Sequence, residues 1–323
     1  MGIASQIARL LLREHRYRPI TGELLVIGKQ TVELSAAQAL SVIDTELGVP
    51  SDVIVSDVET DASTRAGMNK DYITDRGFFA LFSDAKYCCL DQSSYEGAGI
   101  VFNLCDPEFP QELEGRFDFI FDGSSLDNIF DPAMAIRHLA RALRPGGRIF
   151  HVNRTARMHS DYLAFSLSWF HDFYSINDFQ DCQVYLAQRE IDDTRRRWDI
   201  YRYMPVLERD GQLKFFGQDQ YFFQWRHGHC VVIAEKGANS TWKISPIQYQ
   251  YRPTVPNAVV KGSYETLDQG IREFATDPYV KAAVRFSRSG RPCWLRPDEK
   301  VELPPDRLHY APRISYCGSL ESI

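Results

Sequence analysis

Apolar and polar positions follow two different periods along the chain, and these periods predict where helices and strands lie. Short runs of β-branched and aromatic residues, bounded by glycine or by polar side chains, are typical of buried strands. We expect such strands at residues 22–28, 87–90, 100–104, 117–121 and 148–152. Apolar residues that recur every three to four positions predict helices, which we place at 4–16, 35–47, 75–83, 133–143 and 162–174.

The segment 117–153 carries the clearest signal. It reads as a strand ending in Asp122-Gly123, a polar loop, a helix, the tight turn Arg144-Pro145-Gly146-Gly147 and a second strand. Asp131 is the expected N-cap of the helix, with Pro132 at its first position. Both strands are apolar enough to be covered on both faces, which predicts a parallel sheet with its ligand site at the carboxyl ends of the strands. Asp122 and His151 fall near those ends.

Later apolar runs predict the antiparallel strands that complete the sheet, at 182–186, 213–216, 221–225 and 229–234. The fold class we expect is α/β: a Rossmann-like, doubly wound, mostly parallel sheet with an antiparallel edge strand. This domain would span 1–236, with an inserted loop at about 51–76. Nine of the 16 prolines follow residue 240, so we interpret 237–323 as a Pro-rich appendage, with helices at 264–274 and 278–286, that wraps the core or forms homo-oligomer contacts.

Composition narrows the class of partner. The 323 residues are 44% hydrophobic, which suffices for a packed core, and the formal net charge of −6 offers no uniformly positive surface to nucleic acid. No run of 18 uncharged apolar residues exists, and the first residues lack a signal-peptide pattern. We therefore expect a cytoplasmic protein with neither nucleic acid nor membrane as partner.

Three successive strands are predicted to end in polar side chains, at Asp91, at Asn103 and at Asp122. Together with the leucine that precedes the Arg-Pro-Gly-Gly turn, these ends resemble the class I S-adenosylmethionine-dependent methyltransferases over about residues 1–236. The resemblance is closest to the branch associated with sugar and polysaccharide biosynthesis. It implies S-adenosylmethionine as cofactor and a small-molecule or saccharide-linked acceptor.

The resemblance also implies roles for individual residues. In the family, the turn after the first strand passes under the cofactor, and an acid after the second strand takes its ribose hydroxyls. Gly28 and Asp91 occupy these two places. Asn103 with Leu104, and Asp122 with Gly123, occupy the other cofactor-binding places.

One position departs from the family pattern. The first strand is followed by Gly28-Lys29-Gln30-Thr31, where the family has a G-x-G turn that lets the backbone approach the methionine and ribose portions of the cofactor. Lys29 would repel a sulfonium unless its ammonium points to solvent or to the carboxylate of the cofactor. This degenerate turn leaves a second hypothesis open: a methyltransferase-like binding or scaffold module without catalysis. A third, a nicotinamide-dependent Rossmann enzyme, lacks the expected G-x-G-x-x-G.

Methyl transfer needs a bound sulfonium, an acceptor atom held in line and the exclusion of water. A hydroxyl acceptor is helped by a general base, so His151, His159 and the carboxylate of Asp122 are the candidate catalytic residues. His227 and His229 fall on one face of a strand, but no third or fourth ligand can be named, and the cysteines lack metal-site spacing. We expect no metal.

Overall fold

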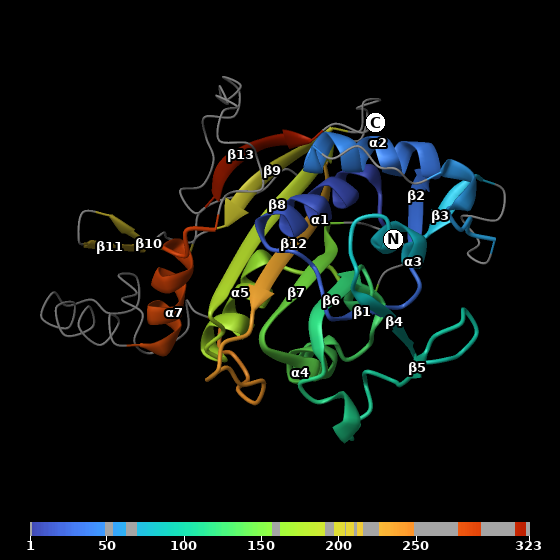
Figure 1. The fold of residues 1–323 in the computed structure, drawn as a ribbon. Helices are drawn as coiled ribbons and strands as arrows, with labels where there is room; N and C mark the ends of the chain where they lie inside the picture. Colours follow the sequence, from blue (N-terminus) through green and yellow to red (C-terminus); the bar gives the residue numbers. More distant parts are fainter. Residues whose placement is uncertain are drawn as a thin grey trace, which may run out of the picture.

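The computed structural model describes residues 2–48, 54–62, 70–156, 162–190, 197–203, 205–209, 212–215, 226–248, 277–291 and 314–320. Its centre is a nine-stranded sheet (Figure 1). In spatial order the strands are β13 (Ile314–Leu320), β9 (Trp198–Tyr203), β8 (Asp181–Glu190), β12 (Arg226–Glu235), β7 (Leu143–Ala156), β6 (Phe117–Gly123), β1 (Glu23–Ile27), β4 (Lys86–Asp91) and β5 (Ile100–Val101).

Strand directions confirm the predicted fold class. From β7 to β5 every neighbouring pair is parallel, and β1 lies between β4 and β6. The antiparallel strands are β12, between β7 and β8, and β9, between β8 and β13. Both lie inside the sheet: β9 is next to the edge strand β13, and β12 is separated from that edge strand by β8 and β9.

Helices cover both faces of the sheet (Figure 1). Alternate strand residues face opposite sides, so Val26 and Phe121 belong to one hydrophobic core while Leu25 and Ile120 belong to the other. The helices in the first core are α1 (Ser5–Tyr17), α2 (Ala36–Leu47) and α3 (Asp75–Ala80). Those in the second are α4 (Pro132–Ala142), α5 (Leu167–Ile176) and α7 (Pro278–Ser287).

Local capping explains several boundaries. Asp131 caps α4 as predicted, since its carboxylate accepts from the Met134 N–H at 3.0 Å and Pro132 is the first helical residue. Ser35 and Gln38 form a capping box at the start of α2. The predicted strand at 100–104 is shorter than expected, because Asn103 turns the chain by accepting from the Cys105 N–H at 3.0 Å.

The segment between β1 and β4 contains more structure than the predicted loop at 51–76. Strand β2 (Thr31–Ser35) pairs antiparallel with β3 (Tyr72–Thr74), and Thr74 then accepts from the Gly77 N–H to cap α3. A 3₁₀ turn, η1, spans Val55–Asp57. Two further 3₁₀ turns are η2 (Gln111–Leu113) and η3 (Leu126–Asn128). The inserted residues thus contribute β3 to a separate two-stranded sheet with β2.

The described parts of 237–323 pack against the core. Helix α7 lies against α5 and β8, and β13 extends the main sheet. Arg291, which follows α7, is buried and pairs with Glu14 on α1 and with Asp181 on β8.

A small hairpin is formed by β10 (Val206–Arg209) and β11 (Gln212–Phe215).

Other expectations keep their status as predictions. The predicted strand at 221–225 and helix at 264–274 lie outside the described residues, and the domain boundary at 236 and the homo-oligomer stay predictions. Among the helices that the structure describes, none combines the length and apolar character needed to cross a membrane. The cytoplasmic location also stays a prediction.

Candidate functional site

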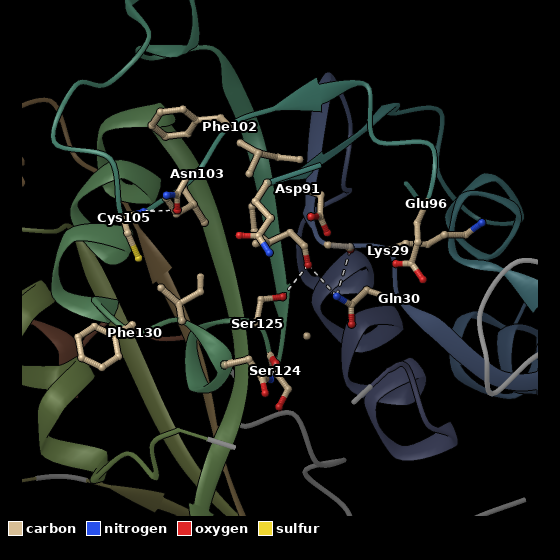
Figure 2. Close-up of a pocket in the computed structure, with 18 of the residues that line it drawn as sticks. Lys29, Gln30, Asp91, Glu96, Phe102, Asn103, Cys105, Ser124, Ser125 and Phe130 are labelled. Carbon is tan, nitrogen blue, oxygen red and sulfur yellow. Dashed lines mark hydrogen bonds between the residues drawn. The ribbon is translucent and has the colours of Figure 1, made fainter. Parts of the chain in front are cut away.

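A cavity of about 570 Å³ lies over the carboxyl ends of β1, β4 and β6 (Figure 2). Its size falls within the range of about 300–1,000 Å³ that small-molecule sites occupy. Five chain segments line it: the turn after β1, the end of β4 with the residues that follow it, the loop after β5, the loop after β6, and Tyr162 in the segment after β7. This is where an open parallel α/β sheet is expected to hold its ligand.

The turn after β1 bends sharply at Gly28. Gly28 has φ +64°, a conformation that favours glycine, and its N–H donates to the Leu90 carbonyl of β4 at 2.7 Å. Asp75, at the start of α3, holds the next residues, because its carboxylate accepts from the Gln30 N–H at 2.8 Å and from the Tyr87 hydroxyl at 2.9 Å. Burial raises the pKa of Asp75, and these two donors oppose the shift.

Gln30 fills the space between the turn and β6. Its side-chain Nε2 donates to the Ile27 carbonyl at 2.7 Å and lies 3.2 Å from that of Gly28. A Cβ at position 123 would lie 2.2 Å from Gln30 Oε1, so Gly123 is required for this packing. Gln30 is 3% exposed, and within the described residues its Oε1 has no hydrogen-bond partner. A buried acceptor of this kind costs free energy unless a ligand supplies a donor.

Two acidic side chains line the same cavity. Asp91 ends β4 and lies beside the turn, since a Cβ at Gly28 would be 3.6 Å from its Oδ2. Partial burial, and then the charge of Asp91, raise the pKa of Glu96. Lys29 runs away from Asp91 in Figure 2, and its Nζ lies 4.0 Å from the carboxylate of Asp61. The two carboxylates of the cavity wall therefore suit a cationic ligand. The ammonium of Lys29 does not oppose such a ligand directly, because it lies near the carboxylate of Asp61.

The loop after β6 has an uncommon backbone conformation. Ser124 has φ +73°, which residues other than glycine rarely adopt, and its hydroxyl donates to the buried Asp127. The next hydroxyl, that of Ser125, donates to the Ile27 carbonyl at 2.7 Å and so joins the ends of β6 and β1. Local strain of this kind is concentrated at ligand sites.

A buried polar chain lies behind this loop. Its members are Asp122, His151 and Tyr174, all fully buried. Asp122 Oδ2 is 2.8 Å from His151 Nδ1, and His151 Nε2 is 2.6 Å from the Tyr174 hydroxyl. Asp122 also accepts from Asn153 Nδ2 at 2.7 Å and from the Ser125 N–H at 2.8 Å. Burial raises the pKa of Tyr174 well above its ordinary value, so its hydroxyl keeps its proton.

The structure divides the residues predicted for the site into two groups and leaves one unplaced. Five of the predicted cofactor-binding residues line the cavity: Gly28, Asp91, Asn103, Leu104 and Gly123. Asp122 and His151 do not line it but sit in the buried polar chain, with both ring nitrogens of His151 facing protein partners. His159 lies outside the described residues. The roles of all eight residues stay predictions.

Several residues that shape the site were not predicted for it. Ser124, Ser125, Glu96, Phe130 and Tyr162 line the cavity. His138 on α4 fixes the loop after β5, because its Nδ1 lies 3.1 Å from the Leu104 carbonyl. Gln30 stands where the family pattern has its second glycine. The missing glycine indicated that this position is unusual, but it did not indicate that the side chain has a buried, unpartnered Oε1. Nothing in the sequence marked the conformation of Ser124.

His227 and His229, the pair considered for a metal and set aside, are described only in part. His229 is buried, and its ring stacks on Trp198 with centroids 4.8 Å apart. The side chain of His227 lies outside the described ones. Across the part of the chain that the structure describes, no three potential metal ligands lie together.

Comparison with known proteins finds distant similarity to solved structures and no match in sequence. No protein-family model and no curated protein matches the sequence. Similar solved structures include phosphoethanolamine N-methyltransferase 2 of Haemonchus contortus with bound S-adenosyl-L-methionine, at 16% identity and TM-score 0.31, over 55% of this chain and 37% of that one. The methyltransferase domain of citrinin polyketide synthase matches at 11% identity and TM-score 0.36, over 72% and 52%.

A third structure is the 1,6-didemethyltoxoflavin N1-methyltransferase of Burkholderia thailandensis with S-adenosylhomocysteine, at 12% identity and TM-score 0.34, over 72% of this chain and 78% of that one. The chain thus spans less than two thirds of the length of the first two proteins. Likeness at these scores identifies neither a cofactor nor a substrate for this chain.

Proposed function

We propose that the protein is an S-adenosylmethionine-dependent methyltransferase that transfers a methyl group in line to a small-molecule or saccharide-linked acceptor. One observation carries the proposal. Gly28, Asp91, Asn103 with Leu104, and Gly123 come from four separate segments, and all of them line one cavity at the carboxyl ends of the strands. These are positions that the resemblance in sequence assigns to the cofactor.

The residues present fit this cofactor. A sulfonium nucleoside carries a positive charge, two ribose hydroxyls and an amino-acid group, and so it needs acceptors and carboxylates. The cavity supplies the carboxylates of Asp91 and Glu96, and Gln30 lines it with a buried, unpartnered Oε1 that a small rotation of the amide would present to a ligand. We assign the ribose hydroxyls to Asp91 and the ammonium of the amino-acid group to Gln30, while Lys29 pairs with Asp61.

The chain's own part in the reaction is to bind, orient and exclude water. When bound, the cofactor supplies an activated methyl group on sulfur. The buried polar chain acts indirectly: Asp122 holds the Ser125 N–H and thereby fixes the loop that lines the cavity. We propose His151 as a positioning residue, because its two ring nitrogens already face Asp122 and Tyr174. A general base for a hydroxyl acceptor is then assigned to His159.

Isothermal titration calorimetry tests the proposal. Purified protein is titrated with S-adenosylmethionine, with S-adenosylhomocysteine and with NADH, and the Asp91→Ala variant is titrated in parallel. We expect both sulfur nucleosides to bind, and we expect Asp91→Ala to weaken them about 10- to 100-fold, the range for a hydrogen bond to a charged group. Saturable binding of NADH instead would favour the nicotinamide enzyme.

One observation favours a second candidate function, a methyltransferase-like binding or scaffold module. The amide of Gln30 occupies space that a second glycine would leave open. If that side chain blocks the site, neither sulfur nucleoside produces heat at millimolar concentration, whereas Gln30→Gly restores binding. Heat from the unaltered protein would show that Gln30 does not block the site.

A further inference from the structure

Two exposed aromatic rings meet at the mouth of the cavity. Phe130 is 85% exposed and Tyr162 is 70% exposed, and both line the cavity. Their ring centroids are 6.2 Å apart and their planes are 89° to each other. Tyr95 is as exposed, at 89%, but does not line the cavity. The Phe130–Tyr162 pair therefore combines exposure with contact at the site.

The backbone holds the two rings in place from both sides. Phe130 directly precedes Asp131, the N-cap of α4. Next to Tyr162, the Leu163 N–H donates to the Asp127 carbonyl at 3.1 Å, and this bond ties the segment after β7 to the loop that carries Phe130. The carboxylate of Asp127 is buried and accepts from Asn128 Nδ2 at 2.9 Å. The backbone positions of the two rings are thus fixed by the protein, and the rings contact each other.

The cavity has a polar side that carries the acidic groups and an aromatic side that carries Phe130, where Asn103 and Cys105 also lie. Figure 2 shows Phe130 across the cavity from Lys29 and Glu96, with Ser124 between the two sides. Gln30 and Asp91, to which we assign cofactor groups, belong to the polar side. The aromatic side is left for the second ligand.

The shape of the ring pair selects the chemistry of that ligand. Two rings at nearly 90° form a corner in which a flat aromatic guest stacks on one face and meets the other ring edge to face. Both contacts are favourable for aromatic pairs, and the guest covers apolar surface that is now in water. A saccharide could stack on one face only and would depend on further polar partners.

We propose that Phe130 and Tyr162 form the acceptor-binding surface, and that the acceptor presents a planar aromatic ring. This inference rests on the proposed methyl transfer and narrows its acceptor from the two classes named above. It assigns Phe130 and Tyr162 to the acceptor and not to the nucleoside of the cofactor.

Saturation-transfer difference NMR tests the acceptor class with three probes of similar size: 4-hydroxyquinoline, cyclohexanol and methyl α-D-glucopyranoside. Each probe is added to the full chain with and without S-adenosylhomocysteine, whose own affinity is measured by calorimetry in the same samples. We expect the quinoline to give the strongest signal. Phe130→Ala and Tyr162→Ala should each weaken its binding at least about fivefold, as expected for the loss of an aromatic contact.

Tyr95→Ala is the matched control, since it removes an equally exposed ring outside the cavity. It should leave quinoline binding unchanged, and all three variants should keep their affinity for S-adenosylhomocysteine. The proposal is overturned if cyclohexanol or the glucoside gives the strongest signal, or if the two cavity variants bind the quinoline as well as the control does. It is also overturned if Phe130→Ala weakens the binding of S-adenosylhomocysteine and not that of the quinoline. Absence of nucleoside binding in the unaltered chain overturns the methyltransferase proposal itself.

Discussion

The cavity and the buried polar chain adjoin each other at the carboxyl end of β6, yet their side chains are satisfied in opposite ways. In the buried polar chain, Asp122 and His151 are fully enclosed and each polar group meets a protein partner. On the cavity wall, the Oε1 of Gln30 has no partner within the described residues. A polar residue near the end of a strand is therefore not enough to identify a ligand contact. A ligand contact also requires a donor or acceptor atom that has no partner within the protein.

Removing the carboxylate of Asp122 should have the largest effect on stability. Asp122→Ala leaves the buried donors of Asn153, Ser125 and His151 without their acceptor. We expect the free energy of unfolding to fall by about 3 kcal/mol, as unpaired buried polar groups typically cost about 1–3 kcal/mol each and partly relax. Urea unfolding followed by tryptophan fluorescence measures the change.

Asp91→Ala is the matched control for this comparison. Asp91 is half-buried at the cavity, so its removal should change the free energy of unfolding by no more than about 0.5 kcal/mol. If Asp91→Ala proved as destabilising as Asp122→Ala, the distinction between the two regions would be wrong.

Replacing Gln30 by leucine should affect binding while keeping most of the side-chain volume. The variant removes the unpartnered Oε1 of Gln30. We expect affinity for S-adenosylhomocysteine to fall about tenfold, the usual scale for a hydrogen bond to a charged group. Affinity for 5′-methylthioadenosine, which lacks the ammonium, should stay the same, and calorimetry with both ligands checks this. An equal loss for the two ligands would show that Gln30 does not contact the ammonium.

The smallest expected effect is a pH dependence that separates charged from neutral ligands. Burial and Asp91 raise the pKa of Glu96 above its ordinary value of 4.5, and Lys29, Asp61 and Asp75 also act on it. As pH rises through that pKa, Glu96 gains a negative charge. The affinity for cationic S-adenosylmethionine, relative to neutral S-adenosylhomocysteine, should then rise by about two- to fivefold, because the charge is partly exposed and screened.

Glu96→Gln should remove this pH dependence while leaving the affinity for S-adenosylhomocysteine unchanged. Calorimetric titrations with both ligands across the acidic range provide the measurement. A ratio that stays constant with pH in the unaltered protein would contradict the assignment of Glu96 to the cationic side of the cavity.

Much of the fold could be predicted from periodicity and capping residues, because these signals are local. The strand ending at Asp122, the helix capped by Asp131 and the parallel sheet follow from such patterns. The pairing of β13 with β9 could not be foreseen, since it joins residues more than 100 positions apart. The same holds for the buried pair of Arg291 with Glu14.

The site was predictable in place but not in detail. Gly28, Asp91 and Gly123 were placed from strand ends and a family resemblance, and they do line one cavity. The sequence could not show that His151 faces Tyr174, because β7 continues to Ala156 and the burial of His151 within it depends on how α5 packs over the strand. Phe130 could not be predicted for the site either, because a single apolar residue in a loop forms no distinctive sequence pattern. Its place at the cavity mouth depends on the fold.

A crystal structure of the protein grown with millimolar S-adenosylhomocysteine tests the central claim most directly. We expect the nucleoside to lie over Gly28, with its ribose hydroxyls on Asp91 and its ammonium on Gln30 Oε1. A nucleoside bound at another site, or a cavity without ligand density at that concentration, would contradict it.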